Sequence, residues 1–165
     1  MPNHITIVIN APEEVIAALV DQEAERVVDF NRLVPQPENI EKGDCSGKHA
    51  PGVVCWYEWN VKYWGTKWNA YGEEVRSPTE LKFETAWSHP VPIIQALHNR
   101  FPSATIDVRF ADEDLGQNLG HYRIVDGEVR PVEEFTAGSE KALDFAAQVS
   151  YGKSYAEVKA EWEDD

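Results

Sequence analysis

LKFETAWSHPVPIIQALHNRFPSATIDVRF, residues 81–110, carries the clearest secondary-structure signals in the chain. Apolar and polar residues alternate over residues 81–87, which predicts a half-buried strand with Trp87 on its apolar face. Apolar residues then recur at helical spacing over residues 90–101, and alternation returns over residues 106–110. The stretch therefore predicts a strand, a helix and a strand in succession.

A second unit of the same kind is predicted at the N-terminus. Isoleucines alternate with polar residues over residues 4–10, as in a strand. Residues 12–24 have an amphipathic helical pattern, and Pro12 is tolerated in a first helical turn. Residues 27–34 predict another strand, which Pro35 stops.

Residues 36–78 separate the two units and are predicted to be an insertion. Its first part, residues 36–51, is polar and contains glycines, which predicts a loop. Large aromatic residues then appear at helical spacing over residues 53–64. Gly65 suits the left-handed conformation that ends many helices, and a second loop is predicted after it.

The C-terminal part begins with a strong hairpin signal. Asp126-Gly127 stands between the segments HYRIV and EVRPV, and this dipeptide is typical of a two-residue hairpin turn. Two helices are predicted after the hairpin, one over residues 139–149. The other opens with the capping box formed by Ser154 and Glu157.

The order of elements predicts an α+β fold, a ferredoxin-like split βαβ sandwich with an antiparallel sheet covered by helices on one face. We expect a single domain over residues 1–165, with a core over about residues 1–132. The aromatic helical insertion then lies between the two βαβ units, and a C-terminal helical extension follows the hairpin over residues 136–165. A parallel α/β sheet is the alternative.

The chain is strongly acidic, with 15 Lys and Arg against 29 Asp and Glu and a formal net charge of −14. Such a surface repels phosphate backbones and anionic membranes, and the basic residues do not cluster along the sequence. We therefore expect neither direct nucleic-acid binding nor membrane binding. One interpretation is that the acidic surface keeps the protein soluble. The alternative is that this surface mimics DNA or contacts a basic partner.

Length and cysteine content favour a cytoplasmic protein. No apolar run approaches the roughly 18 residues that span a bilayer, and the segment MPNHITIVIN lacks the basic region of a signal peptide. Cys45 and Cys55 can pair, but reduced thiols are the expected state in the cytosol.

The segment YWGTKWNA, residues 63–70, is the main candidate site. Rings at helical spacing are typical of core packing, which is one interpretation of this segment. The other is a ligand- or partner-binding loop, because polar side chains follow a glycine and are flanked by aromatic rings. The candidate residues are Trp64, Thr66, Lys67, Trp68 and Asn69.

Weaker signals concern metals. Asp112 and Asp114 have the spacing of a calcium loop without its glutamate, and a turn is the alternative. Cys45, His49 and Cys55 have no fourth ligand at a zinc-like interval. We expect no bound metal.

Enzymatic activity has little support in the sequence. There is no nucleophile elbow, P-loop or dinucleotide fingerprint, so no cofactor or catalytic residue is predicted. His98 lies on the apolar face of its predicted helix, where we expect a histidine at the edge of the core with one bonded nitrogen.

Several segments of the first 125 or so residues resemble the YubB ferredoxin-like domain family of bacterial plasmid and phage proteins. They are MPNH at 1–4, DFNRLVPQP at 29–37, WGTKWNA at 64–70, ETAWSHPVPII at 84–94 and FP at 101–102. The resemblance implies a ferredoxin-like fold and a mobile-element origin. It implies no iron–sulfur cluster, because the chain has two cysteines where a cluster needs four.

These observations lead to two functional hypotheses. The first is a non-enzymatic protein-interaction module that uses its acidic surface or the aromatic insertion to bind a basic or nucleic-acid-associated protein. The second is a small-molecule or nucleotide binder, with or without enzymatic activity, whose site is the WGTKWNA loop.

Overall fold

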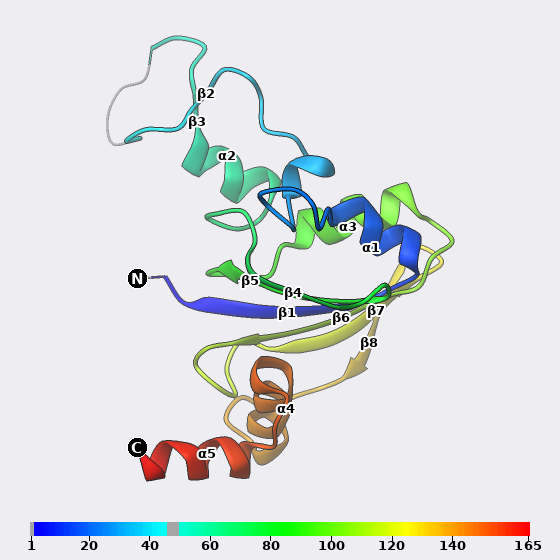
Figure 1. The fold of residues 1–165 in the computed structure, drawn as a ribbon, viewed down its shortest axis with the longest axis vertical. Helices are drawn as coiled ribbons and strands as arrows, with labels where there is room; N and C mark the ends of the chain where they lie inside the picture. The colour runs from blue at the N-terminus through cyan, green and yellow to red at the C-terminus, as the bar shows by residue number, and fades with distance from the viewer. Residues whose placement is uncertain (1, 46–49) are drawn as a thin grey trace.

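The computed structural model describes residues 2–45 and 50–165 (Figure 1). The strands of its main sheet are β1 (His4–Asn10), β4 (Tyr71–Ser77), β5 (Glu80–Ala86), β6 (Ile106–Asp112), β7 (Gly120–Val125) and β8 (Glu128–Glu133). A separate small sheet pairs β2 (Ile40–Glu41) with β3 (Val54–Cys55). The helices are α1 (Glu13–Leu19), the short 3₁₀ helix η1 (Phe30–Arg32), α2 (Trp56–Tyr63), α3 (Val91–Arg100), α4 (Glu140–Tyr151) and α5 (Tyr155–Asp164).

The main sheet has the strand order β4-β5-β1-β6-β7-β8, and every neighbouring pair is antiparallel. Along the chain, β1, α1, β4, β5, α3 and β6 follow one another as in a ferredoxin-like βαββαβ unit. The β7–β8 hairpin extends this unit by two strands at the β6 edge. The α+β prediction is confirmed, and the parallel-sheet alternative is wrong.

Helices lie on both faces of the sheet, whereas the sequence predicted them on one face. Helices α1 and α3 lie on the face where Ile7 and Phe83 are buried, and α4 and α5 lie on the opposite side (Figure 1). There Val8 of β1 and Ala111 of β6 form a small second core with Ala146 of α4. Strand alternation makes this possible, because Val8 points away from its neighbour Ile7.

The strand predicted over residues 27–34 is wrong. Val28 forms a single antiparallel bridge with Val20, and the chain then turns into η1. The side chain of Asp29 accepts a hydrogen bond from the backbone N–H of Asn31, which caps this short helix. Phe30 is fully buried in the main core. The apolar pattern of this segment therefore reflects burial in the core, and the segment does not pair as a strand.

The true second strand of the unit is β4, in a segment that the sequence predicted as a loop. Its seven residues, YGEEVRS, contain one aliphatic side chain, Val75, which packs against the core. The strand pairs with β5 through Glu74 opposite Lys82 and Val75 opposite Leu81. An edge strand of this kind is held mainly by its neighbour, so its own pattern is weak.

The C-terminal predictions are confirmed. Asp126 and Gly127 form the β7–β8 turn with positive φ values of 51° and 82°. Ser139 caps α4 by accepting a hydrogen bond from the N–H of Ala142. Ser154 and Glu157 form the predicted capping box of α5.

The insertion contains a disulfide between Cys45 and Cys55, with Cα atoms 5.8 Å apart. The expectation of reduced thiols is therefore wrong for this structure. The parallel pairing of β2 with β3 places Glu41 opposite Cys55, which brings the nearby Cys45 within bonding reach.

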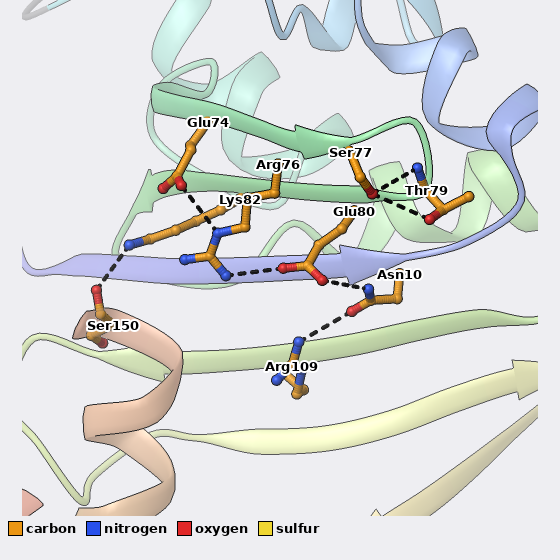
Figure 2. A network of polar contacts seen from close by, with 9 residues as sticks. All are labelled: Asn10, Glu74, Arg76, Ser77, Thr79, Glu80, Lys82, Arg109 and Ser150. Carbon is orange, nitrogen blue, oxygen red and sulfur yellow. Dashed lines mark hydrogen bonds and ion pairs between the residues drawn. The ribbon is translucent and has the colours of Figure 1, made fainter. Parts of the chain in front are cut away.

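A polar network on the α4 side of the sheet ties α4 to the strands (Figure 2). The ammonium group of Lys82 donates a hydrogen bond of 2.9 Å to the carbonyl oxygen of Ser150, near the end of α4. This contact gives a helix-end carbonyl a hydrogen-bond donor. It also places a positive charge near the negative end of the helix dipole, where a cation is favoured.

Within residues 2–45 and 50–165, no helix combines the length and apolar character needed to cross a membrane.

Candidate functional site

The loop after α2 begins at a sharp helix end. The carbonyl oxygen of Asn60 accepts hydrogen bonds from the N–H groups of Trp64 and Gly65, at 2.8 and 3.0 Å. Gly65 has a φ of 77°, as predicted for the residue that stops this helix. A Cβ at this position would lie 2.7 Å from Cδ of Pro92, so both the conformation and the space require glycine.

Trp64 belongs to the core. Its side chain is 2% exposed and packs edge-on against the rings of Phe30 and Trp59. Its indole N–H donates a hydrogen bond of 2.8 Å to the carbonyl oxygen of Val34. Of the two interpretations of the aromatic segment, core packing therefore applies to this residue.

Thr66 and Asn69 hold the loop in place. The buried hydroxyl of Thr66 donates to the carbonyl oxygen of Trp68 at 2.7 Å. The amide oxygen of Asn69 accepts from the N–H groups of Phe30 and Ala70, at 3.0 and 2.9 Å. These polar side chains serve the backbone of the loop and of η1.

Asn69 also interacts with the carboxylate of Asp29. Its amide N–H donates to Oδ1 of Asp29 at 2.8 Å. Burial raises the pKa of Asp29, but hydrogen bonds from Asn69 and Asn31 outweigh burial and lower that pKa below its usual value. The loop and η1 are thus joined by a charge-assisted contact.

Replacing Asn69 with alanine should lower the free energy of unfolding by about 1–3 kcal/mol, because the N–H of Phe30 loses its partner and the carboxylate of Asp29 loses one of its donors. Urea denaturation checks the value. Asn99→Ala, at an exposed position of α3, is the control and should change stability by less than about 0.5 kcal/mol. Equal losses in both variants would contradict the anchoring role.

Lys67 and Trp68 remain at the surface. The Lys67 ammonium lies 4.7 Å from the ring centroid of Trp68 and 5.0 Å from that of Trp87, within cation–π range of both. The ring of Tyr57 contacts Trp87 edge-on, with centroids 5.8 Å apart. Tyr57, Trp68 and Trp87 are 37%, 38% and 42% exposed. We name Tyr57, Lys67, Trp68 and Trp87 the aromatic patch.

Trp87 occupies an unusual backbone conformation. Its φ of 76° is left-handed, which is rare for a bulky residue. Its N–H donates to the carbonyl oxygen of Asn3 at 2.9 Å, and the hydroxyl of the next residue, Ser88, donates to the carbonyl oxygen of Gly65. The prediction that Trp87 shares the buried face of β5 is wrong, because its side chain is exposed beyond the strand end. Such strain is concentrated at functional sites.

A second feature, a cavity of about 230 Å³, lies between α3 and the β7–β8 hairpin. Its polar lining includes His89, His98 and Tyr122. His98 was predicted to have one bonded nitrogen, and its Nδ1 is buried without a hydrogen-bond partner among the described residues. Sequence reasoning missed this cavity because its residues come from two segments far apart in the sequence, residues 89–98 and 122–129.

Comparison with known protein families matches residues 64–152 to the ferredoxin-like domain in Api92-like protein. The match covers more than half of the 165 residues. The chain belongs to this Api92-like family. The ferredoxin-like part of the expected resemblance is thereby confirmed, under a family name other than YubB.

Among solved structures, the chain is similar to protein api92 from Yersinia pseudotuberculosis, with 18% sequence identity and a TM-score of 0.49. The similarity covers 73% of this chain and 44% of that chain, so the chain spans less than half the length of that relative. Comparison with curated proteins gives no match.

Asp112, one of the two calcium-site candidates, is held by hydrogen bonds from other residues of the protein. Asp112 is buried, and its Oδ1 accepts hydrogen bonds from the side chain of Asn3 and the N–H of Asp114. Its Oδ2 accepts from Asn118, as in the turn that was the alternative interpretation. Asp114 is exposed.

The cysteine and histidine candidates do not assemble a metal centre in the described part of the chain. Cys45 and Cys55 are joined to each other, so neither is a free thiolate. His49 lies outside the described residues. Within residues 2–45 and 50–165, no three His, Cys, Asp or Glu side chains lie close enough to hold a metal ion.

The sheet brings together basic residues that are far apart in the sequence. Arg76, Lys82 and Arg109 lie on the same face of the sheet in Figure 2. Each is already engaged, Arg76 with two glutamates, Lys82 with a carbonyl and Arg109 with Oδ1 of Asn10. Because these groups have protein partners, the cluster is a poor phosphate-binding surface.

Proposed function

We propose that this domain is a non-enzymatic protein-interaction module whose contact surface is centred on the aromatic patch. The observation that carries the proposal is a cluster of three exposed rings: Trp68 and Trp87 lie within cation–π range of Lys67, and Tyr57 contacts Trp87. They come from α2, the WGTKWNA loop and the end of β5. Tryptophan and tyrosine are enriched among the residues that dominate binding energy at protein interfaces.

The charge of the chain supports a basic partner. A net charge of −14 steers a positively charged protein toward the domain and disfavours phosphate-rich ligands. A nucleic-acid-associated protein is one partner of this kind. The plasmid or phage origin implied by the sequence resemblance is part of this proposal and agrees with such a target.

A cytoplasmic location stays a prediction. The Cys45–Cys55 disulfide is a feature more typical of oxidising compartments than of the cytosol. The partner is therefore to be sought without assuming a reducing environment.

The second candidate function is binding of a small molecule or nucleotide beside the WGTKWNA loop. An open depression of about 490 Å³ there is lined by Asn60, Trp68 and Asn69, among others. Its polar groups are largely engaged with each other: Gln36 donates to Asn60, and Asn60 donates to the carbonyl oxygen of Lys67. Groups that are already paired offer a ligand less, so we favour the interaction module.

Replacing Trp87 or Trp68 with alanine should weaken capture of a basic partner from a bacterial lysate by about 30-fold, as expected for an interface hot spot. The measurement is quantitative pull-down with the full chain, followed by binding of the purified partner. Trp162→Ala is the matched control, because Trp162 is 54% exposed on α5, on the opposite side of the sheet.

Two results would contradict the proposal. One is partner binding that survives in both patch variants while their thermal stability is unchanged. The other is an equal loss in Trp162→Ala, which would place the contact elsewhere. A salt titration separates the two contributions, since binding by the acidic surface weakens as ionic strength rises and binding by the rings persists.

A further inference from the structure

The cavity beneath the β7–β8 hairpin results from the way this sheet is enlarged. Helices α1 and α3 belong to the ferredoxin-like unit, and the hairpin adds two strands beyond β6. Side chains of α3 and of the hairpin line the cavity together, among them Ile94 and Ile124. Both isoleucines are almost fully buried, whereas Val129 of β8 lines the cavity and is 64% exposed, which places it at the mouth.

Three polar side chains of the lining have unused hydrogen-bonding capacity. Within the described residues, the side chains of His89, His98 and Tyr122 make no hydrogen bond, and Nδ1 of His98 is completely buried. Buried polar atoms in folded proteins almost always have a partner, so the unpaired Nδ1 of this cavity-lining histidine is an unusual feature of the site. An imidazole offers a donor and an acceptor, and a phenol offers a hydroxyl.

The cavity also provides a flat surface. The imidazole of His89 stacks on the ring of Phe110, with centroids 3.9 Å apart and an angle of 13° between the planes. The ring of Tyr122 lies beside it, with its centroid 5.9 Å from that of His89. Aromatic walls of this kind favour a planar occupant.

Two ring side chains of the lining, those of His89 and Tyr122, are uncharged at neutral pH. Burial lowers the pKa of His89 to about 4 and raises the pKa of Tyr122 to about 12, so both side chains stay neutral. No Asp, Glu, Lys or Arg is among the described residues that line the cavity. A charged ligand would lose its hydration without gaining a counter-ion, so the site selects against charge.

The volume limits the size of the occupant. A cavity of about 150 Å³ accommodates benzene. At about 230 Å³ the present cavity suits a molecule of one fused pair of rings. We propose that this cavity binds an uncharged nitrogen heteroaromatic molecule of about the size of a purine base. The site is separate from the aromatic patch and does not depend on the proposed interaction function.

The test is titration of the ¹⁵N-labelled full chain at pH 7 with adenine and with benzimidazole, followed by NMR. We expect saturable shifts at Ile94, Ile124 and Gly127 and at the ring nitrogens of His89 and His98. The charged analogue 1,3-dimethylbenzimidazolium, of similar shape, should produce no saturable shifts. Tyr122→Phe should weaken binding by about 3- to 10-fold through the loss of one hydrogen bond.

A blocked variant and its control keep the proposal open to refutation. Val129→Trp places an indole at the exposed mouth without disturbing the core and should abolish the shifts. Val132→Trp, on the same strand but outside the cavity lining, should leave them unchanged. The proposal is overturned if neither probe gives saturable shifts, if the cationic analogue binds equally well, or if Val129→Trp binds like the wild type.

Discussion

Replacing Trp64 with alanine should lower the free energy of unfolding by about 3–5 kcal/mol, the cost typical of removing a buried tryptophan. The side chain is 2% exposed and lies between the rings of Phe30 and Trp59, so its removal leaves a void at the junction of α2, η1 and the sheet. The carbonyl oxygen of Val34 also loses the indole N–H that satisfies it. Urea denaturation followed by circular dichroism measures the change.

Trp68→Ala is the informative control for Trp64→Ala. Trp68 is four residues further along the chain but 38% exposed, so its removal should cost less than about 1 kcal/mol. A Trp64→Ala loss as small as that of Trp68→Ala would show that the ring is not part of the core. Together the two variants separate the packing role from the interaction role of this segment.

Gly65→Ala should lower the free energy of unfolding by about 2–5 kcal/mol, the sum of two costs. A left-handed alanine costs about 1–2 kcal/mol, and Gly65 has a φ of 77°. The new Cβ would also lie 2.7 Å from Cδ of Pro92, and such overpacking typically costs about 1–3 kcal/mol. Because Pro92 is held at the start of α3, the strain is transmitted between the insertion and the second helix of the sandwich.

Gly152→Ala isolates the conformational part of this cost. Gly152 ends α4 with a φ of 68°, and an added Cβ there would meet no atom within 4 Å. It should therefore lose only about 1–2 kcal/mol. The difference between the two variants, measured by urea denaturation, reports the clash with Pro92. If the two losses are equal, close packing of Gly65 against α3 does not limit stability.

The elements predicted correctly from the sequence are those whose pattern is local. Strands β1, β5 and β6 and helix α3 each present an apolar face to the same core, so their periodicity is visible in the residues themselves. The β7–β8 turn and the caps of α4 and α5 were predictable for the same reason. Their chemistry lies within a few consecutive residues.

The elements predicted wrongly depend on distant partners. Residues 27–34 are apolar enough for a strand, yet the N–H of Phe30 bonds to Asn69 and the ring packs on Trp64. Strand β4 has little apolar pattern and exists because it pairs with β5. No local window contains either partner.

The candidate site shows the same division. Gly65 was recognised from its place after a helical pattern, and the structure agrees. Which ring is buried could not be read from the sequence, since Trp64 and Trp68 have the same chemistry and differ only in direction. Trp87 belongs to the aromatic patch because its own left-handed backbone conformation turns its side chain away from the strand, where it contacts Lys67, while its N–H bonds to Asn3.

By itself the sequence determined the α+β class, the order of the main periodic elements, the helix stop at Gly65 and the acidic charge of the chain. Periodicity, turn chemistry and charge are properties of neighbouring residues or of the whole composition, so they need no knowledge of the fold. Only the tertiary structure decided the strand order of the sheet, the place of α4 on its second face, the aromatic patch and the cavity at His89 and His98. Each of these depends on contacts between segments far apart in the chain, whose free energy is set by packing and hydrogen bonding that no short stretch of sequence contains.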